Sequence, residues 1–88
     1  MKAEDFERAI QEEASRIKIN IAKCLRRSFT EDHPIITDTD QHFYLMKMMG
    51  LVDTKPNHQA RLGINYHSLT PQARELYEDL LAKGYYNS

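Results

Sequence analysis

The chain has 88 residues, of which 41% are hydrophobic and 28% charged, and its formal net charge is -1. This length suits one small domain, and the composition is globular rather than disordered. The near-zero net charge excludes a strongly basic polyanion binder whose affinity comes from overall charge. There is no apolar run of membrane-spanning length, the acidic N-terminus is no signal peptide, and one cysteine cannot form an internal disulfide. We therefore expect a reduced, cytoplasmic setting.

The N-terminal third of the chain carries one apolar stripe with helical spacing. The stripe consists of Phe6, Ile10, Ala14, Ile17, Ile21 and Leu25. This periodicity predicts one long helix over residues 1–28, with acidic side chains in its first turns and basic ones in its last, as the helix dipole favours. A straight helix of that length would measure about 39 Å, whereas a domain of this size has a diameter of roughly 30 Å.

Two outcomes follow from this excess length. A continuous helix would overhang the domain and expose Phe6 and Ile10, which is unfavourable by about 25 cal/mol per Å² of apolar surface. A second copy of the chain would cover the overhang, giving a homodimer with Phe6, Ile10 and Ile17 in its interface. Alternatively, the helix breaks near Ser15, where the stripe is weakest, and the first residues fold back onto their own domain.

A second helix is predicted over residues 38–49. Pro34 separates it from the first pattern, and residues 34–37 have the composition of a short strand. Thr37 and Asp40 form a near-capping box, and Gly50 is a natural C-terminal stop. Helical spacing directs one set of side chains inward: Phe43, Met46 and Met49, with Leu45 and His42 beside them. The opposite, outer stripe consists of Gln41, Tyr44 and Met48, flanked by Asp40 and Lys47.

A wing-like hairpin is predicted over residues 51–69, followed by a closing helix over residues 70–83. In the hairpin, Leu62–Tyr66 alternates apolar and polar residues and is expected to pair antiparallel with Leu51–Thr54 across a polar loop. In the helix, Thr70 is the expected N-cap and Pro71 the first residue. The expected buried face of this helix consists of Ala73, Leu76, Tyr77, Leu80 and Leu81.

The order of these elements predicts an α+β fold for a single domain over residues 1–88. The segments Leu45–Val52 and Leu69–Leu81 resemble winged helix-turn-helix regulators of the bacterial and phage PadR and MarR type. In those families a helix ends in a Gly-Leu-Val or Gly-Leu-Ile step into the first wing strand, and the second wing strand runs through a Leu-Thr step into a closing helix. The resemblance implies a small winged-helix-like protein that binds DNA and regulates transcription.

The resemblance also implies which residues contact DNA. They are Gln41, Tyr44, Lys47, Lys55, His58 and Arg61. The first three would enter a groove, where glutamine pairs with adenine and lysine with guanine or phosphate, and the wing would contact phosphates or the minor groove. The chain departs from the family because residues 29–37 leave no room for an additional helix. Either the first pattern breaks into two helices, or the motif is degenerate.

A protein-interaction module on the same scaffold, such as a small inhibitor or adaptor, is the alternative. The carboxylates of Asp38 and Asp40 oppose DNA, and exposed Tyr and Met side chains are enriched at protein interfaces. A basic cluster of Lys18, Lys23, Arg26 and Arg27 is either a phosphate patch or a solvated helix end.

The sequence carries no recognisable catalytic or metal-binding motif. The four histidines lack metal-ligand spacing, and the position of Cys24 toward a helix C-terminus disfavours a reactive thiolate. We therefore expect no metal, no cofactor and no enzymatic activity.

Overall fold

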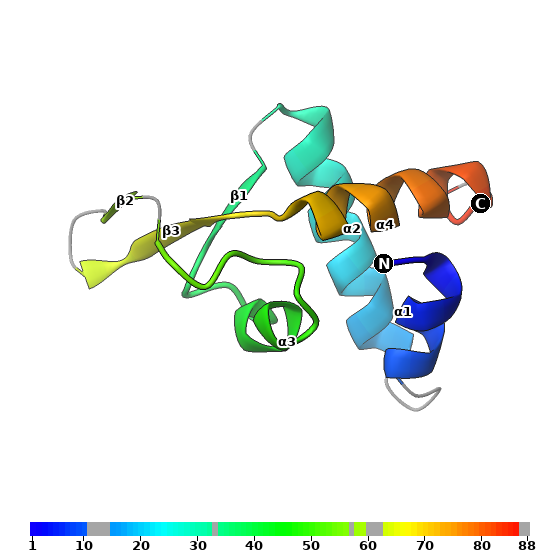
Figure 1. Cartoon of the computed structure of the whole chain (residues 1–88), viewed down its shortest axis with the longest axis horizontal. Coiled ribbons are helices and arrows are strands. Elements are labelled where there is room, and N and C mark those ends of the chain that lie inside the picture. The colour runs from blue at the N-terminus through cyan, green and yellow to red at the C-terminus, as the bar shows by residue number, and fades with distance from the viewer. Residues whose placement is uncertain (11–14, 33, 57, 60–62, 87–88) are drawn as a thin grey trace.

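The structure is a computed structural model that describes residues 1–10, 15–32, 34–56, 58–59 and 63–86. Its elements are, in chain order, α1 (Ala3–Ala9), α2 (Ser15–Thr30), β1 (Ile35–Thr37), α3 (Phe43–Met48), β2 (His58–Gln59), β3 (Asn65–Ser68) and α4 (Pro71–Ala82). The fold is α+β, as the sequence predicts. The helices α1, α2 and α4 lie together at one end of the molecule, and β2 and β3 project from the other end (Figure 1).

The expected continuous helix over residues 1–28 is wrong, because the chain forms two separate helices there. α1 ends at Ala9, Ile10 has extended backbone, and α2 begins at Ser15. α1 folds back onto α4, where the backbone N–H of Ala3 donates a hydrogen bond to the Asp79 carboxylate at 2.7 Å. Both Ala3 and Lys83 lower the pKa of Asp79, since each stabilises its charged form.

The residues that the overhang would have exposed are instead part of the core. Phe6 is 0% exposed and Ile10 is 4% exposed, and Ile17 packs against the same core. The expected dimer interface is corrected at Phe6 and Ile10, because side chains buried inside one chain offer no surface to a second copy. Ile17 is only partly buried, so its place in an interface, like homodimerisation itself, stays a prediction.

β3 is the central strand of a three-stranded antiparallel sheet with the order β1-β3-β2. The predicted pairing of Leu51–Thr54 with Leu62–Tyr66 is wrong. The strand that pairs with the N-terminal half of β3 is β2, which lies inside the expected polar loop. Residues 52–53 lie beside the C-terminal end of β3 instead, where Asp53 N–H donates to the Ser68 carbonyl at 2.9 Å.

α3 is shorter than the predicted helix over residues 38–49, because its expected first turn is used by the sheet. Thr37 belongs to β1, and Asp38 extends the pairing by donating its N–H to the Asn65 carbonyl at 3.0 Å. Two successive turns, from Thr37 to Asp40 and from Asp40 to Phe43, then lead into the helix. The capping box is therefore wrong, since sheet pairing has taken its first residue.

The end of α3 and the start of α4 agree with the sequence prediction. Gly50 has a φ of +77°, and Leu51 N–H donates to the Met46 carbonyl at 2.9 Å, as in a Schellman motif. At the other junction, the Thr70 hydroxyl accepts a hydrogen bond from Ala73 N–H at 3.2 Å and so caps α4.

The core lies where α1, α2, α3 and α4 meet. Its largest fully buried side chains are Phe6, Ile21, Leu25, Met46, Leu51, Leu76 and Leu80. The expected buried face of α4 is confirmed at Ala73, Leu76, Tyr77 and Leu80. It is wrong at Leu81, which is 47% exposed.

The neighbouring leucines of α4 provide a matched test of this core. Leu80→Ala should lower the free energy of unfolding by about 2–5 kcal/mol, because it removes a buried side chain and leaves a cavity. Leu81→Ala should change it by less than about 0.5 kcal/mol, as is usual at the surface. Urea denaturation followed by circular dichroism measures both. Equal effects of the two substitutions would contradict this assignment of the α4 faces.

The position of α1 gives a second prediction. The double substitution Phe6→Glu, Ile10→Glu should unfold the chain, because it places two carboxylates in an apolar core. Far-UV circular dichroism measures the loss of structure, and light scattering measures the molecular mass. A variant that stays folded and changes only from dimer to monomer would contradict the fold-back and favour the overhanging helix.

Candidate nucleic-acid interface

The outer stripe of α3 is exposed, as its spacing predicts. Tyr44 is 71% exposed and Met48 is 84% exposed, and Gln41 is exposed in the turn before the helix. Lys47 lies half-buried on the same short helix. Gln41, Tyr44 and Lys47 therefore form the part of the expected DNA-contact set that the fold brings together.

The other members of that set belong to the projecting hairpin. Lys55 is exposed in the loop before β2, where its N–H donates to the Asp53 carboxylate at 3.2 Å. His58 begins β2 and pairs with Tyr66 of β3. Arg61 lies outside the described residues. The hairpin has the projecting position of a wing (Figure 1).

The two aspartates that opposed DNA in the sequence are engaged inside the molecule. The Asp38 carboxylate accepts hydrogen bonds from the Asn65 backbone N–H at 3.3 Å and from its side-chain amide at 3.2 Å. The Asp40 carboxylate accepts the N–H of His42 at 3.3 Å. Both residues are half-buried, and these hydrogen bonds hold their carboxylates in place while leaving the negative charges.

Eight of the described cations fall into two groups, and Arg26 and Arg74 lie over the Tyr86 and Phe29 rings instead. One group forms ion pairs with carboxylates of α1 or α4: Lys2 with Glu75, Arg8 with Asp5, Lys18 with Glu7, and Lys83 with both Glu4 and Asp79. A second group lies on α2, on α3 and before β2. Its members, Lys23, Arg27, Lys47 and Lys55, have no carboxylate within 4.0 Å among the residues that the structure describes.

The four side chains of the expected basic cluster on α2 therefore do not lie on one face. Lys18 is buried against Glu7 at 2.6 Å, and the Arg26 guanidinium lies 5.6 Å from the centre of the Tyr86 ring. Lys23 and Arg27 instead line a groove between α2 and the turn before α3. Only these two members of the cluster border the turn that carries Gln41.

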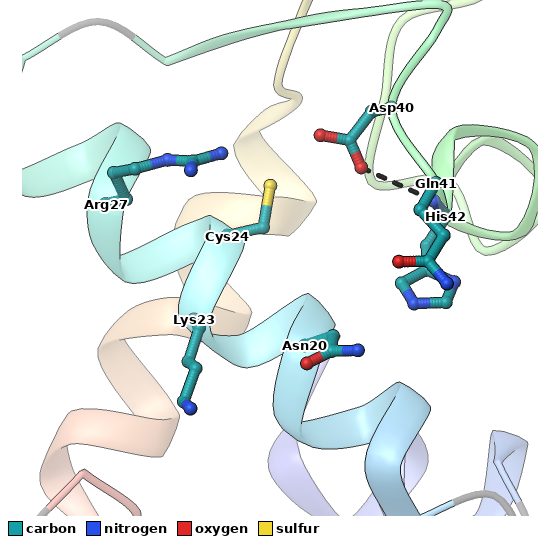
Figure 2. A pocket seen from close by; sticks show the side chains of 7 residues that line it. All are labelled: Asn20, Lys23, Cys24, Arg27, Asp40, Gln41 and His42. Atoms are coloured by element: carbon teal, nitrogen blue, oxygen red, sulfur yellow. Dashed lines mark hydrogen bonds between the residues drawn. The ribbon is translucent and has the colours of Figure 1, made fainter.

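This α2–turn groove has a volume of about 360 Å³. It is lined by Asn20, Lys23, Cys24 and Arg27 of α2 and by Asp40, Gln41 and His42 of the facing turn. Figure 2 shows Arg27 and Asp40 directed toward Cys24 from opposite walls, and the Asn20 amide directed across the groove toward residues 41–42. The Nε2 of His42 is buried behind this wall and has no hydrogen-bond partner among the residues that the structure describes.

A buried histidine in β3 is a feature that the sequence analysis missed. The alternation of β3 placed Tyr66 on the buried side, but His67 is the buried residue of the pair. Its Nδ1 lies 3.0 Å from the Asp53 carbonyl oxygen, and its ring lies 4.6 Å from that of Phe43. His67 therefore has a structural role beneath the sheet.

The helices do not form a compact helix-turn-helix. The break after α1 supplies an additional helix, but residues 31–42 and the strand β1 separate α2 from α3. A helix-turn-helix joins its two helices by a turn of about 3–4 residues. Of the two possibilities left by the sequence, the structure shows the break of the first pattern into two helices, and the helix-turn-helix resemblance stays a prediction.

Comparisons with protein-family models, with curated proteins and with solved structures find no match to this chain. Within the described ranges, no helix combines the length and the apolar character needed to cross a bilayer. Function is therefore argued from the geometry above.

The groove thiol gives a prediction of its own. Burial raises the pKa of the Cys24 thiol, and the nearby Asp40 carboxylate adds to this rise because it disfavours a second negative charge. We expect Cys24 to react with an aromatic disulfide reagent more slowly than free cysteine at neutral pH, with the rate increasing only at higher pH. Asp40→Asn should shift that increase to lower pH. A wild-type rate equal to that of free cysteine would contradict the burial of this thiol.

Proposed function

We propose that this chain is a small winged-helix-like DNA-binding protein that regulates transcription in the cytoplasm and has no enzymatic activity. The exposed face of α3, with Gln41, Tyr44 and Lys47, would contact the bases, and the hairpin that carries Lys55 and His58 would contact the backbone. Arg61 is included among these DNA-contacting residues on the basis of the sequence alone.

The observation that carries the proposal is the distribution of the cations. Lys23, Arg27, Lys47 and Lys55 have no carboxylate partner among the described residues and lie on α2, on α3 and before the wing, whereas Lys2, Arg8, Lys18 and Lys83 are bound by carboxylates of α1 and α4. Arg26 of α2 and Arg74 of α4 lie over aromatic rings instead. DNA affinity comes mainly from cations that replace counterions at the phosphates. Cations already paired within the protein contribute less to that exchange.

The exposed apolar side chains of α3 favour a second candidate function. Tyr44 and Met48 are largely exposed, and such residues are enriched at protein interfaces. A non-enzymatic protein-interaction module on the same scaffold would use this face without the wing cations. The two functions therefore differ in how strongly binding depends on salt.

Titration of a fluorescent mixed-sequence DNA duplex at two salt concentrations tests the proposal. With four phosphate contacts, affinity should fall by about 100-fold between roughly 50 and 200 mM salt. Lys55→Gln should weaken binding by about tenfold near 0.1 M salt, because one contact is lost. Lys2→Gln is the matched control, since Lys2 is also exposed but is paired with Glu75, and it should leave affinity unchanged.

Two results would overturn the proposal. Absence of wild-type binding at the lower salt concentration would exclude DNA as a partner and favour the protein-interaction module. Equal losses from Lys55→Gln and Lys2→Gln would show that binding depends on total charge rather than on the wing. Circular dichroism of each variant confirms that it is folded.

A further inference from the structure

β1 is an edge strand, because in the sheet order β1-β3-β2 it pairs with β3 on one side only. In an antiparallel ladder, alternate residues direct their N–H and C=O groups toward the neighbouring strand, and the residues between them direct theirs away. Pro34 and Asp38, which flank β1, are both hydrogen-bonded to the β3 segment. By this alternation Ile36 also faces β3, whereas Ile35 and Thr37 face the free edge.

The free edge presents three backbone groups that have no partner among the described residues. They are the N–H and C=O of Ile35 and the N–H of Thr37. The Thr37 carbonyl is already used, because it accepts the Asp40 N–H at 3.1 Å. All three residues of β1 are β-branched, which favours strand pairing, and Ile35 is 38% exposed. Natural proteins commonly protect such an edge with a charged side chain, and β1 contains none.

A groove of about 220 Å³ lies along β1 and is called here the β1–α2 groove. Its lining consists of the three residues of β1, of Arg27, Ser28 and Glu31 near the end of α2, and of Asp40. Arg27 and Asp40 are directed toward Cys24 from opposite walls, so their charges balance (Figure 2). Glu31 is exposed and has no cation within 4.0 Å among the described residues, which leaves the groove with a net negative charge.

We propose that the free edge of β1 binds an extended peptide segment of a partner protein, with alternating apolar and basic side chains, as a fourth strand of the sheet. One residue of the segment would exchange two hydrogen bonds with Ile35, and the Thr37 N–H would donate a third. An apolar side chain there would pair with Ile35 on the outer face. The next side chain points to the opposite face, where Ile36 is buried, and a basic group there suits the charge of Glu31.

A single strand suits this edge better than a second copy of the chain. Neighbouring strands lie about 4.8 Å apart, so a peptide needs only the width of one strand beside β1. In a second copy, the end of α2 would accompany β1 into the same space, and its Glu31 would add another negative charge. The β1–α2 groove shares no residue with the proposed DNA contacts, so the peptide would bind whether or not the chain binds DNA.

End-blocked synthetic pentapeptides, added to the full chain, test this edge. Lys-Val-Lys-Val-Lys should bind and slow the solvent exchange of the Ile35 and Thr37 amides, as followed in ¹H–¹⁵N spectra, because both become hydrogen-bonded. The Ile36 amide faces β3 and should be protected with and without peptide. Lys-Pro-Lys-Pro-Lys has the same charge but lacks the N–H that pairs with the Ile35 carbonyl, so it should protect neither amide. Glu-Val-Glu-Val-Glu should bind severalfold more weakly, because it repels Glu31.

Two pairs of variants locate the peptide. Thr37→Pro removes the outward N–H but none of the bonds to β3, and should weaken binding of Lys-Val-Lys-Val-Lys by at least about fivefold. Thr37→Val keeps that N–H and should bind like the wild type. Glu31→Gln should weaken binding by about two- to threefold, whereas Glu78→Gln, at an exposed carboxylate of α4, should not change it. Protection of the Ile36 amide establishes that β1 is still paired in each variant. If Thr37→Pro does not fold, the proline peptide makes the same test.

Several results would overturn the proposal. Absence of binding by Lys-Val-Lys-Val-Lys would exclude this occupant. Binding without protection of Ile35 and Thr37 would place the peptide elsewhere, and equal binding of the valine and proline peptides would indicate contact through charge only. Protection of both amides in the free chain that increases with protein concentration would identify a second copy as the occupant. Protection that is independent of concentration would show that the edge is already covered.

Discussion

Thr70 holds together the end of α3 and the beginning of α4. Its hydroxyl donates a hydrogen bond to the Gly50 carbonyl at 2.6 Å and accepts one from Ala73 N–H, and its own N–H donates to the Leu51 carbonyl at 3.0 Å. Because β3 leads directly into this residue, one threonine sets the position of the sheet relative to both helices. Gly50 adds a backbone constraint, since its φ of +77° is a conformation that residues with a Cβ rarely adopt. The exposed face of α3 is therefore positioned by the same contacts that close the core.

Local signals in the sequence correctly predicted the helix ends around this junction. The elements that were predicted wrongly depend on contacts between residues far apart in the chain. Thr70 and Gly50 act through neighbouring backbone groups, so their roles are visible in a few residues of sequence. The start of α3 depends instead on Asp38, whose partner Asn65 is distant along the chain. The break before Ser15 likewise depends on the docking of α1 against α4. Periodicity continues across such a break, because both helices present apolar residues to one core.

The candidate interface likewise combines features that local signals predicted with contacts that they did not. Tyr44 and Met48 were predicted to be exposed because a helix separates its faces every 3.6 residues, and the structure agrees. The facing of Asn20 toward residues 41–42 was beyond sequence reasoning, since it depends on how the turn before α3 packs against α2 (Figure 2). His67 was misplaced for a related reason. A polar residue on a buried strand position is tolerated only when it finds a partner, and the partner is a backbone carbonyl that no side-chain pattern records.

The net charge of -1 is a weak guide to what this molecule binds, because its charges are used differently at its two ends. The carboxylates of α1 and α4 hold cations in ion pairs at one end of the longest axis, which measures 37 Å, and the hairpin projects at the other (Figure 1). At physiological ionic strength, exposed charges farther apart than about 8 Å are largely screened from each other. Acidic groups near the termini therefore do little to repel a phosphate at the wing. A partner at that end responds to the local cations, and the overall charge does not exclude DNA.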